Sequence, residues 1–221
     1  ITAIPQLLEM LELHGAIVTI DAMGCQREIA AKIVQGGGDY ALQVKGNQPS
    51  LKEGIEEAFA VADEGDATKT KARRRTTRKK SRGRLATRHY TIMPLPESML
   101  SFAKKWSKLI SIGRVVREVE HHGKQTSETS YYICSFDAKV GVFSESVRSH
   151  WGIENGLHWV MDVVFGEDRS RIRKGHAAEN MSFLRRFAIT LLKRDTSKSS
   201  LKQKRKEAAW DTSFLEKLLF C

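Results

Sequence analysis

Acidic and histidine side chains at two places in this sequence are of the types that carry chemistry. Asp21 directly follows the apolar, β-prone run 16–20, and a carboxylate at the carboxyl end of a strand in an open α/β sheet can hold a divalent metal ion. Asp21 and Glu154 together would make a carboxylate pair for two-metal phosphoryl chemistry, which suits Mg²⁺ or Mn²⁺. Four residues that recur at every fourth position would form one polar stripe on a helix: His150, Glu154, His158 and Asp162.

Each of these features also has a purely structural interpretation. Aspartate after a strand is often a turn or helix-cap residue, and spaced Glu and His side chains can form ion pairs on a half-exposed helix. The neighbours of the stripe are strongly apolar, which predicts a largely buried helix in which a carboxylate needs a partner or a metal. Zinc is disfavoured because no HExxH motif is present. We expect Trp151 and Trp159 to pack in the core rather than to stack on unpaired bases.

The positive charge of the chain is concentrated in one segment. The net charge is +11, and eleven of the 37 Lys and Arg lie in residues 69–88, which contain no Asp or Glu. A local cationic segment favours binding to a polyanion, because each neutralised phosphate releases counterions. A solvated basic loop without a ligand is the alternative. The expected partner is double-stranded DNA, and the candidate contacts in this segment are Arg73, Arg74, Arg75, Arg78, Lys79, Lys80 and Arg84.

Length and composition restrict the class of protein. A chain of 221 residues can form one domain with a smaller insertion, and no apolar run approaches the roughly 20 residues of a membrane span. Three cysteines without a CxxC pair argue against a disulfide framework and for the reducing cytoplasm. The first residues lack both an initiator methionine and a secretory signal, so we expect a piece of a longer reading frame.

Hydrophobic periodicity predicts the elements that position these residues. The order strand, helix, strand over residues 16–44 favours a parallel pair with a right-handed crossover, the unit of α/β folds. Ser50 is expected to cap a helix, and residues 196–206 read as a polar linker. The expected helices are 5–14, 26–35, 50–62, 138–164, 176–193 and 212–220, and the expected strands are 16–20, 40–44, 84–93, 109–120 and 129–136.

Four segments resemble one family of bacterial proteins. They are TIDAMGCQ (19–26), LQVKGNQ (42–48), RSHWGIENGLHW (148–159) and FGEDRSRIR (165–173). On these segments, and nearly from end to end, the chain resembles the H-repeat-associated branch of insertion-sequence DDE transposases.

The resemblance implies an α/β fold with an RNase H-like catalytic core and a β-rich insertion before the glutamate-bearing helix. Asp21 matches the second aspartate and Glu154 the glutamate of the family's acidic triad, so both are expected to bind Mg²⁺ or Mn²⁺ in a two-ion site. Side chains after the second strand could contact phosphates and base edges, or could simply stabilise a loop. The further DNA contacts that we expect are Lys45, Asn47, Gln48, Arg148, His150, Arg171 and Arg173.

The sequence departs from the family pattern in three places. The opening aspartate of the triad would precede residue 1, so the core is expected to lack its first strands. Related transposases carry a tyrosine, arginine, glutamate signature with a lysine further along, where this chain has Val147, His150 and Met161. In residues 83–88, Ala86 stands where an acidic residue is usual.

We therefore expect a partial core with the second acidic motif in residues 1–66, a basic loop and β-rich insertion in 67–136, helices that complete the core in 137–195, and a linker with a terminal helix in 196–221. The expected function is metal-dependent DNA cleavage and strand transfer of an insertion sequence, acting on element ends and target DNA, with no small-molecule substrate and with a homodimer as one expected assembly. One alternative is a DNA-binding remnant without catalysis. Another is a metal-dependent nuclease, whose third acidic ligand would be Asp39, Asp162 or Asp168.

Overall fold

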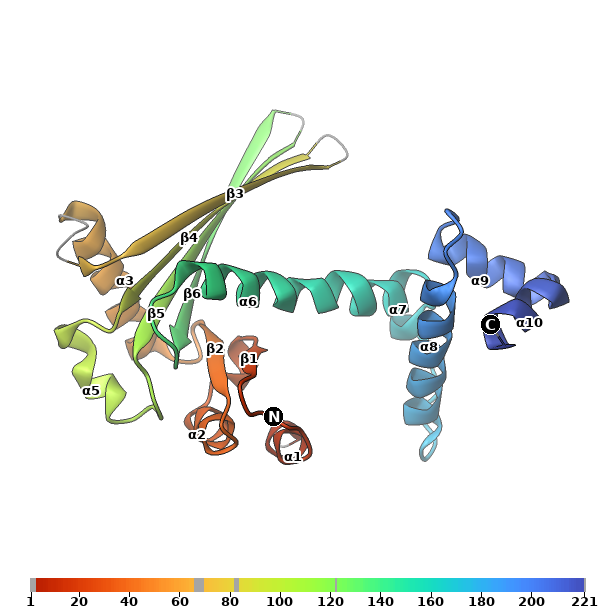
Figure 1. Cartoon of the computed structure of the whole chain (residues 1–221), viewed down its shortest axis with the longest axis horizontal. Coiled ribbons are helices and arrows are strands. Elements are labelled where there is room, and N and C mark those ends of the chain that lie inside the picture. Colours follow the sequence, from red (N-terminus) through yellow and green to blue (C-terminus); the bar gives the residue numbers. More distant parts are fainter. Residues whose placement is uncertain (1–2, 66–69, 82–83, 122, 221) are drawn as a thin grey trace. The chain divides into compact units, whose positions relative to one another are not determined.

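The computed structural model describes residues 3–65, 70–81, 84–121 and 123–220 (Figure 1). It divides into two compact units, Ile1–His150 and Trp151–Cys221, each considered by itself below. In the described ranges, no helix is both long and apolar enough to cross a membrane.

A six-stranded sheet forms the centre of the first unit, in the order β1-β2-β6-β5-β4-β3. β1 (Ile17–Ile20) pairs parallel with β2 (Asp39–Val44), and α2 (Arg27–Gln35) connects the two strands. This confirms the predicted strand, helix, strand unit and the α/β class. The remaining strands pair antiparallel with their neighbours, and they are β3 (Arg73–Ser81), β4 (Arg84–Pro94), β5 (Ser111–His121) and β6 (Lys124–Cys134).

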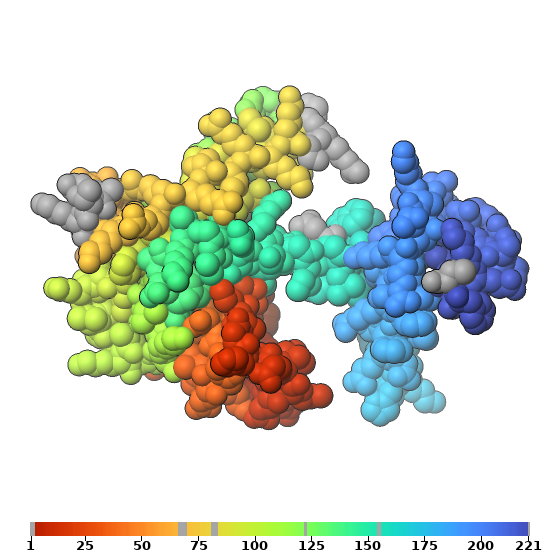
Figure 2. Space-filling view, in the orientation of Figure 1, coloured from red at the N-terminus to blue at the C-terminus, as the bar shows by residue number. Residues whose placement is uncertain are grey.

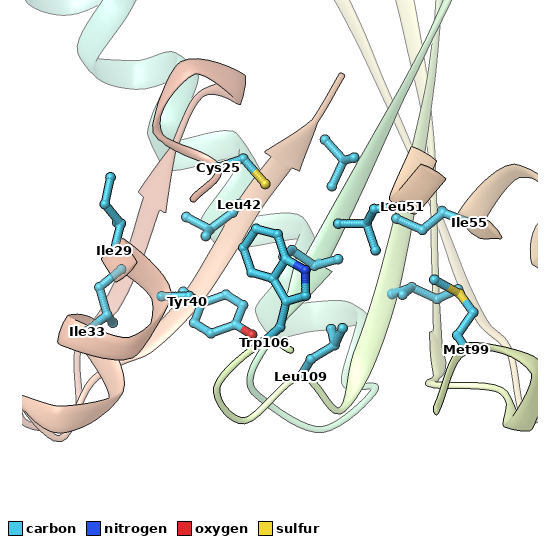
Figure 3. Packing of buried hydrophobic residues seen from close by; sticks show 14 of the residues in the cluster. Cys25, Ile29, Ile33, Tyr40, Leu42, Leu51, Ile55, Met99, Trp106 and Leu109 are labelled. Carbon is cyan, nitrogen blue, oxygen red and sulfur yellow. The ribbon is translucent and has the colours of Figure 1, made fainter. Parts of the chain in front are cut away.

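The first face of this sheet packs against the helices of the N-terminal half. Trp106 is 1% exposed and lies in a cluster with Tyr40, Leu42 and Leu109 (Figure 3). Because side chains alternate between the faces of a strand, Tyr40 and Leu42 of β2 both point into this cluster. The helices that contribute to this region are α1 (Ala3–Glu9), α2, α3 (Pro49–Glu64) and α5 (Leu100–Ala103).

The second face packs against α6 (Val140–Ile153). Phe143 of α6 is fully buried, and its ring meets Tyr90 and Tyr132 edge-on, with centroid separations of 6.3 and 5.5 Å. A Cβ atom at position 113 would lie 2.4 Å from the Phe143 ring. Glycine at this position of β5 therefore allows the helix to approach the sheet.

The basic segment is a strand, not the loop that its composition predicted. β3 pairs with β4 over nine residues, from Arg73 opposite Ile92 to Ser81 opposite Arg84. Lys and Arg have low strand propensity, but their long aliphatic stems can lie along a half-exposed sheet face. β6 also pairs with β2, so the strands expected in a separate insertion continue the core sheet.

The helix predicted over 138–164 is interrupted. α6 ends at Ile153, a π-helical turn spans Glu154–His158, and α7 (Trp159–Val163) follows. The prediction that this stretch is largely buried is wrong for Trp151 and Trp159, which are 38% and 55% exposed.

The C-terminal helices of the second unit are α8 (Ala177–Arg194), α9 (Leu201–Trp210) and α10 (Thr212–Phe220). α8 and α10 agree with the prediction, whereas α9 replaces much of the expected linker. Ser200 caps α9 by accepting a hydrogen bond from the Gln203 backbone N–H at 3.2 Å. The buried ammonium of Lys204 pairs with Asp195 at 2.9 Å. A cap, one buried ion pair and the packing of Leu201 against the apolar cluster that contains Val160 and Ile189 thus stabilise a largely polar segment.

Three boundary predictions also need correction. The first helix ends at Glu9 instead of residue 14, and the chain then turns through Gly15, which has a φ of +70°. Ser50 lies inside α3 because Pro49 occupies its first turn, with Gln48 at the N-cap position. β1 is half-buried rather than covered on both faces, since it lies at the edge of the sheet.

Candidate metal site and nucleic-acid interface

Asp21 lies at the carboxyl end of β1, as predicted, and its carboxylate is exposed. It occupies the N-cap position of the short 3₁₀ turn Ala22–Gly24, but its side chain makes no capping hydrogen bond. Asp21 thus begins a turn through its backbone carbonyl, which accepts from the Gly24 N–H at 3.1 Å, while its side chain takes no part in capping. Because nothing among the described side chains neutralises this carboxylate, it can serve as a hard oxygen ligand for a divalent cation.

The loop that carries Asp21 is held by the loop that follows β2. Asn47 donates a hydrogen bond from Nδ2 to the Ala22 carbonyl at 2.6 Å, and Gln48 donates from Nε2 to the Cys25 carbonyl at 3.1 Å. The two amides thus position the Asp21 loop, an interaction between loops that sequence spacing does not reveal. Lys45 of the same segment is exposed.

Cys25, at the end of the Asp21 loop, lies in the hydrophobic core. The thiol is fully buried, and burial raises its pKa to about 12. A protonated thiol is a weak ligand for a hard cation. We therefore assign Cys25 to packing beneath the Asp21 loop.

A side-chain contact joins the Asp21 strand to α6. Thr19 Oγ1 lies 3.3 Å from Nδ1 of His150, a part-buried hydrogen bond. Thr19 was not among the predicted site residues, because nothing in the sequence relates it to a helix about 130 residues away. Because Nδ1 of His150 is bonded to Thr19 of β1, only Nε2 of this ring is available to contact DNA.

The polar stripe predicted around Glu154 is not regular in the structure. Glu154 opens the π-helical turn, which changes the angular spacing of the residues that follow. π-helical turns within helices are frequent at functional sites. The side chain of Glu154 lies outside the described part of the structure, and its backbone belongs to the second unit, whereas Asp21 belongs to the first.

The acidic residues considered for a nuclease site have other surroundings. Asp39 begins β2 and lies at the end of the strand pair opposite to Asp21. Its carboxylate binds Lys108 at 2.8 Å and Ser135 at 2.7 Å, so Asp39 is a structural residue. Burial, and then the nearby charge of Asp168, raise the pKa of Asp162. Within the described side chains, no group of three or more acidic, His or Cys residues could hold a metal ion.

The candidate DNA contacts of the basic strand differ in their partners. Arg74 lies 3.6 Å from Asp63, which also receives two hydrogen bonds from Arg114. Arg75 donates to Ser144 Oγ of α6 at 2.9 Å. Exposed cations without such a partner in the described structure are available for DNA, and they are Arg73, Arg78, Lys79, Lys80 and Arg84.

The remaining candidates are divided between the two units. Arg148 lies on α6 in the first unit. Arg171 and Arg173 are exposed in the second unit, after the 3₁₀ turn Glu167–Arg169.

Comparison with known proteins identifies relatives of the whole chain. The sequence profile of the family described as "Transposase DDE domain" matches residues 1–191. The chain is 38% identical over 226 residues to "H repeat-associated putative transposase YhhI" of Escherichia coli (strain K12), and the match covers 99% of this chain and 58% of that protein. "Putative protein YbfL" of the same strain matches with the same identity and shares.

A further relative is "Putative transposase YncI" of Escherichia coli O157:H7, which is 39% identical over 224 residues and is covered to 56%. The chain therefore spans less than two thirds of the length of these relatives. No solved structure matches significantly. The mixed α/β architecture agrees with the RNase H-like domain of DDE transposases, a family that generally uses divalent metal ions.

Proposed function

Because the chain belongs to the DDE transposase family, we propose that Asp21 and Glu154 are two of the carboxylates that bind divalent metal ions for DNA strand cleavage and strand transfer. The observation that carries this proposal is the exposed carboxylate of Asp21. Asp21 directly follows β1, makes no capping bond and lies in a loop held by Asn47 and Gln48. The proposed ions are Mg²⁺ or Mn²⁺, whose preferred ligands are carboxylate and phosphate oxygens.

When bound, a pair of such ions activates the attacking hydroxyl and stabilises the leaving oxygen of a phosphodiester. The residues of this chain contribute position and charge. Asp21 and Glu154 supply oxygen ligands, while the cations of β3 bind the phosphates of double-stranded DNA. The hydrogen bonds of Asn47 and Gln48 limit the motion of the Asp21 loop, which supports the geometry that in-line attack requires.

The third carboxylate of the triad belongs, in this proposal, to a strand next to β1. β1 is an edge strand of the described sheet, so its outer edge can accept such a strand. A cavity of about 290 Å³ lies beside it, lined from β1 by Ile17 and Thr19 and from α6 by Val142, Glu145, Ser146 and Ser149.

The DNA contacts proposed outside the basic strand are Lys45, Asn47, Gln48, Arg148, His150, Arg171 and Arg173. The substrates would be the ends of an insertion sequence and its target, acted on in the bacterial cytoplasm by a monomer or a homodimer.

Cleavage of plasmid DNA tests the proposal. We would fuse a strand that carries the family's first aspartate before Ile1 and measure nicking of supercoiled DNA with Mn²⁺. Nicking should fall roughly 100-fold or more in Asp21→Asn and in Glu154→Gln, because each change removes a metal ligand. Glu57→Gln is the matched control, since Glu57 is exposed on α3. Nicking that survives both ligand changes would contradict the proposal.

DNA binding without catalysis is the second candidate function. The observation that favours it is the group of exposed cations on β3 and β4, which can bind DNA phosphates whether or not a metal ion is bound. This candidate function predicts that the chain binds DNA in a gel-shift experiment. It also predicts that the fused chain does not nick supercoiled DNA under any metal condition. Metal-dependent nicking that needs Asp162 or Asp168 instead of Asp21 would point to the nuclease alternative.

A further inference from the structure

A cavity of about 270 Å³ opens within the first unit, between the β3–β4 strand pair and α6. In the space-filling view the yellow surface of β3 lies beside the green surface of α6 (Figure 2). Five cationic side chains line this cavity, whereas only one carboxylate, that of Glu145, does so. The cationic residues are Arg75, Arg78, Lys79, Arg88 and Arg148.

Strand register brings part of this charge together on one face of the sheet. Arg88 of β4 lies opposite Thr77 of β3 and opposite Arg117 of β5. Like charges directly opposite each other in antiparallel strands are destabilising. Arg148 of α6, the helix that packs on the sheet, contributes a further guanidinium to the same cavity. The fold thus holds three arginines close together at a cost in stability.

The nearby acidic side chains pair with the flanking arginines, not with Arg88 or Arg148. Glu145 lies 3.6 Å from Arg75, and Glu128 lies 3.6 Å from Arg117. Arg88 and Arg148 form no ion pair with a carboxylate in the described ranges. The Nε atom of Arg117 is buried without a hydrogen-bond partner there. Burial, and then the charge of Arg148, lower the pKa of Arg88, as expected for a cation that lacks a counter-ion.

We propose that this cavity binds a phosphate group of a nucleic-acid backbone, with Arg88 and Arg148 as its principal ligands. The inference rests on the proposed DNA-binding function and adds to it a defined phosphate site. Guanidinium groups bind phosphate oxygens through two parallel hydrogen bonds, so a pair of arginines suits this anion. Arg88 was not among the predicted contacts.

The charge outside the cavity favours a DNA phosphate over a free phosphate ion. The exposed Arg84 lies four residues before Arg88 on β4 and therefore on the same face of the sheet, so it extends the row of cations beyond the cavity. A single ion would use only the cavity, whereas a duplex backbone presents phosphates to the whole row. The site would fix DNA against α6, the helix whose chain continues to Glu154.

Binding to a duplex of about 20 base pairs at several salt concentrations, in EDTA, tests this site without any contribution from catalysis. The test variant is Arg88→Gln/Arg148→Gln. The charge-matched control is Lys104→Gln/Lys105→Gln, which removes two exposed cations after α5. Inorganic phosphate is titrated as a second ligand, with melting temperature as the readout.

We expect the test variant to lose roughly tenfold or more in affinity and the slope of log K against log salt to become shallower by about 2. The control should change neither quantity appreciably. Without ligand, the test variant should melt at the same or a higher temperature than the parent, because the arginine repulsion is relieved. This result would also show that the variant folds.

An unchanged slope and affinity in a folded test variant would overturn the inference while leaving DNA binding by the rest of β3 intact. Saturation of the cavity by inorganic phosphate without competition from the duplex would identify a free anion as the ligand, and would also overturn it. If the parent chain itself does not bind DNA, the proposed function fails together with this site. Arg88→Lys provides a second folded variant, and it should retain the charge but lose part of the affinity.

Discussion

Thr19 Oγ1 lies 3.3 Å from Nδ1 of His150, so one hydrogen bond joins β1, the strand that precedes Asp21, to α6, the helix that precedes Glu154. Thr19 precedes Asp21 by two residues, and His150 precedes Glu154 by four. The two proposed metal ligands therefore follow residues that are in contact. Both residues of this contact belong to the first unit, so the hydrogen bond holds α6 against the strand that precedes Asp21.

A double-mutant cycle on Thr19→Val and His150→Phe measures this contact. We expect a coupling free energy of about 0.5–1.5 kcal/mol, the range for one hydrogen bond in a folded protein. The measurement is urea unfolding of the parent, the two single variants and the double variant. A coupling indistinguishable from zero would mean that the two side chains do not interact in solution.

Substitution of Gly113 tests the packing of α6 on the sheet. Gly113→Ala places a methyl group 2.4 Å from the Phe143 ring and should lower the free energy of unfolding by about 1–3 kcal/mol. Gly141→Ala is the matched control, because a Cβ atom there meets nothing within 4 Å. The control should be neutral or stabilising by up to about 1 kcal/mol. Equal effects of the two changes would argue against close packing at Gly113.

Asp195 makes the second unit sensitive to acid. Hydrogen bonds from Ser197, and then from Lys204 and Lys217, hold the pKa of this carboxyl well below its usual range. A carboxyl whose pKa is depressed by folding stabilises the protein above its unfolded pKa of about 4 and loses that contribution as the pH falls through the folded pKa.

Hydrogen exchange of the α9 and α10 amides measures this contribution. Their protection should decrease as the pH falls below about 4, and Asp195→Asn should reduce protection already at neutral pH while removing part of the acid dependence. Ser197→Ala should give a smaller effect in the same direction. Protection in Asp195→Asn equal to that of the parent at neutral pH would exclude this role.

The partners of the basic residues predict which of them contribute most to DNA binding. Replacing Arg78, Lys79 and Lys80 with Gln should make the salt slope shallower by about 3. Replacing Arg73, Arg74 and Arg75 should change the slope less, because Arg74 lies near the carboxylate of Asp63 and Arg75 near that of Glu145. Fluorescence anisotropy with a labelled duplex measures both slopes. A larger change in the second triple variant would reverse this ranking.

Local sequence patterns were sufficient to predict many of the helices and strands. α2, β2 and α10 follow from apolar periodicity and glycine stops, and Asp21 could be placed from the end of its strand. β3 could not be predicted, since nine residues rich in Lys and Arg become a strand only by pairing with β4. The π-helical turn at Glu154 likewise has no signal in residue spacing.

The candidate site was predictable only in part for the same reason. Asn47 and Gln48 were identified, but their bonds to the Asp21 loop depend on the parallel pairing of β1 with β2. Thr19 and Arg88 were missed because each acquires its role from α6, which is distant in sequence. Such contacts between distant segments are set by tertiary packing.

Thermal unfolding in the presence of Mn²⁺ tests the central claim most directly, namely that Asp21 and Glu154 bind the same metal ions. A ligand that binds only the folded state raises its stability, so Mn²⁺ should raise the melting temperature of the parent and of the Glu57→Gln control. Asp21→Asn and Glu154→Gln should each abolish most of this increase, and the double variant should lose no more than either single variant. An increase that persists in the double variant would contradict the account, because the metal would then be bound by other residues.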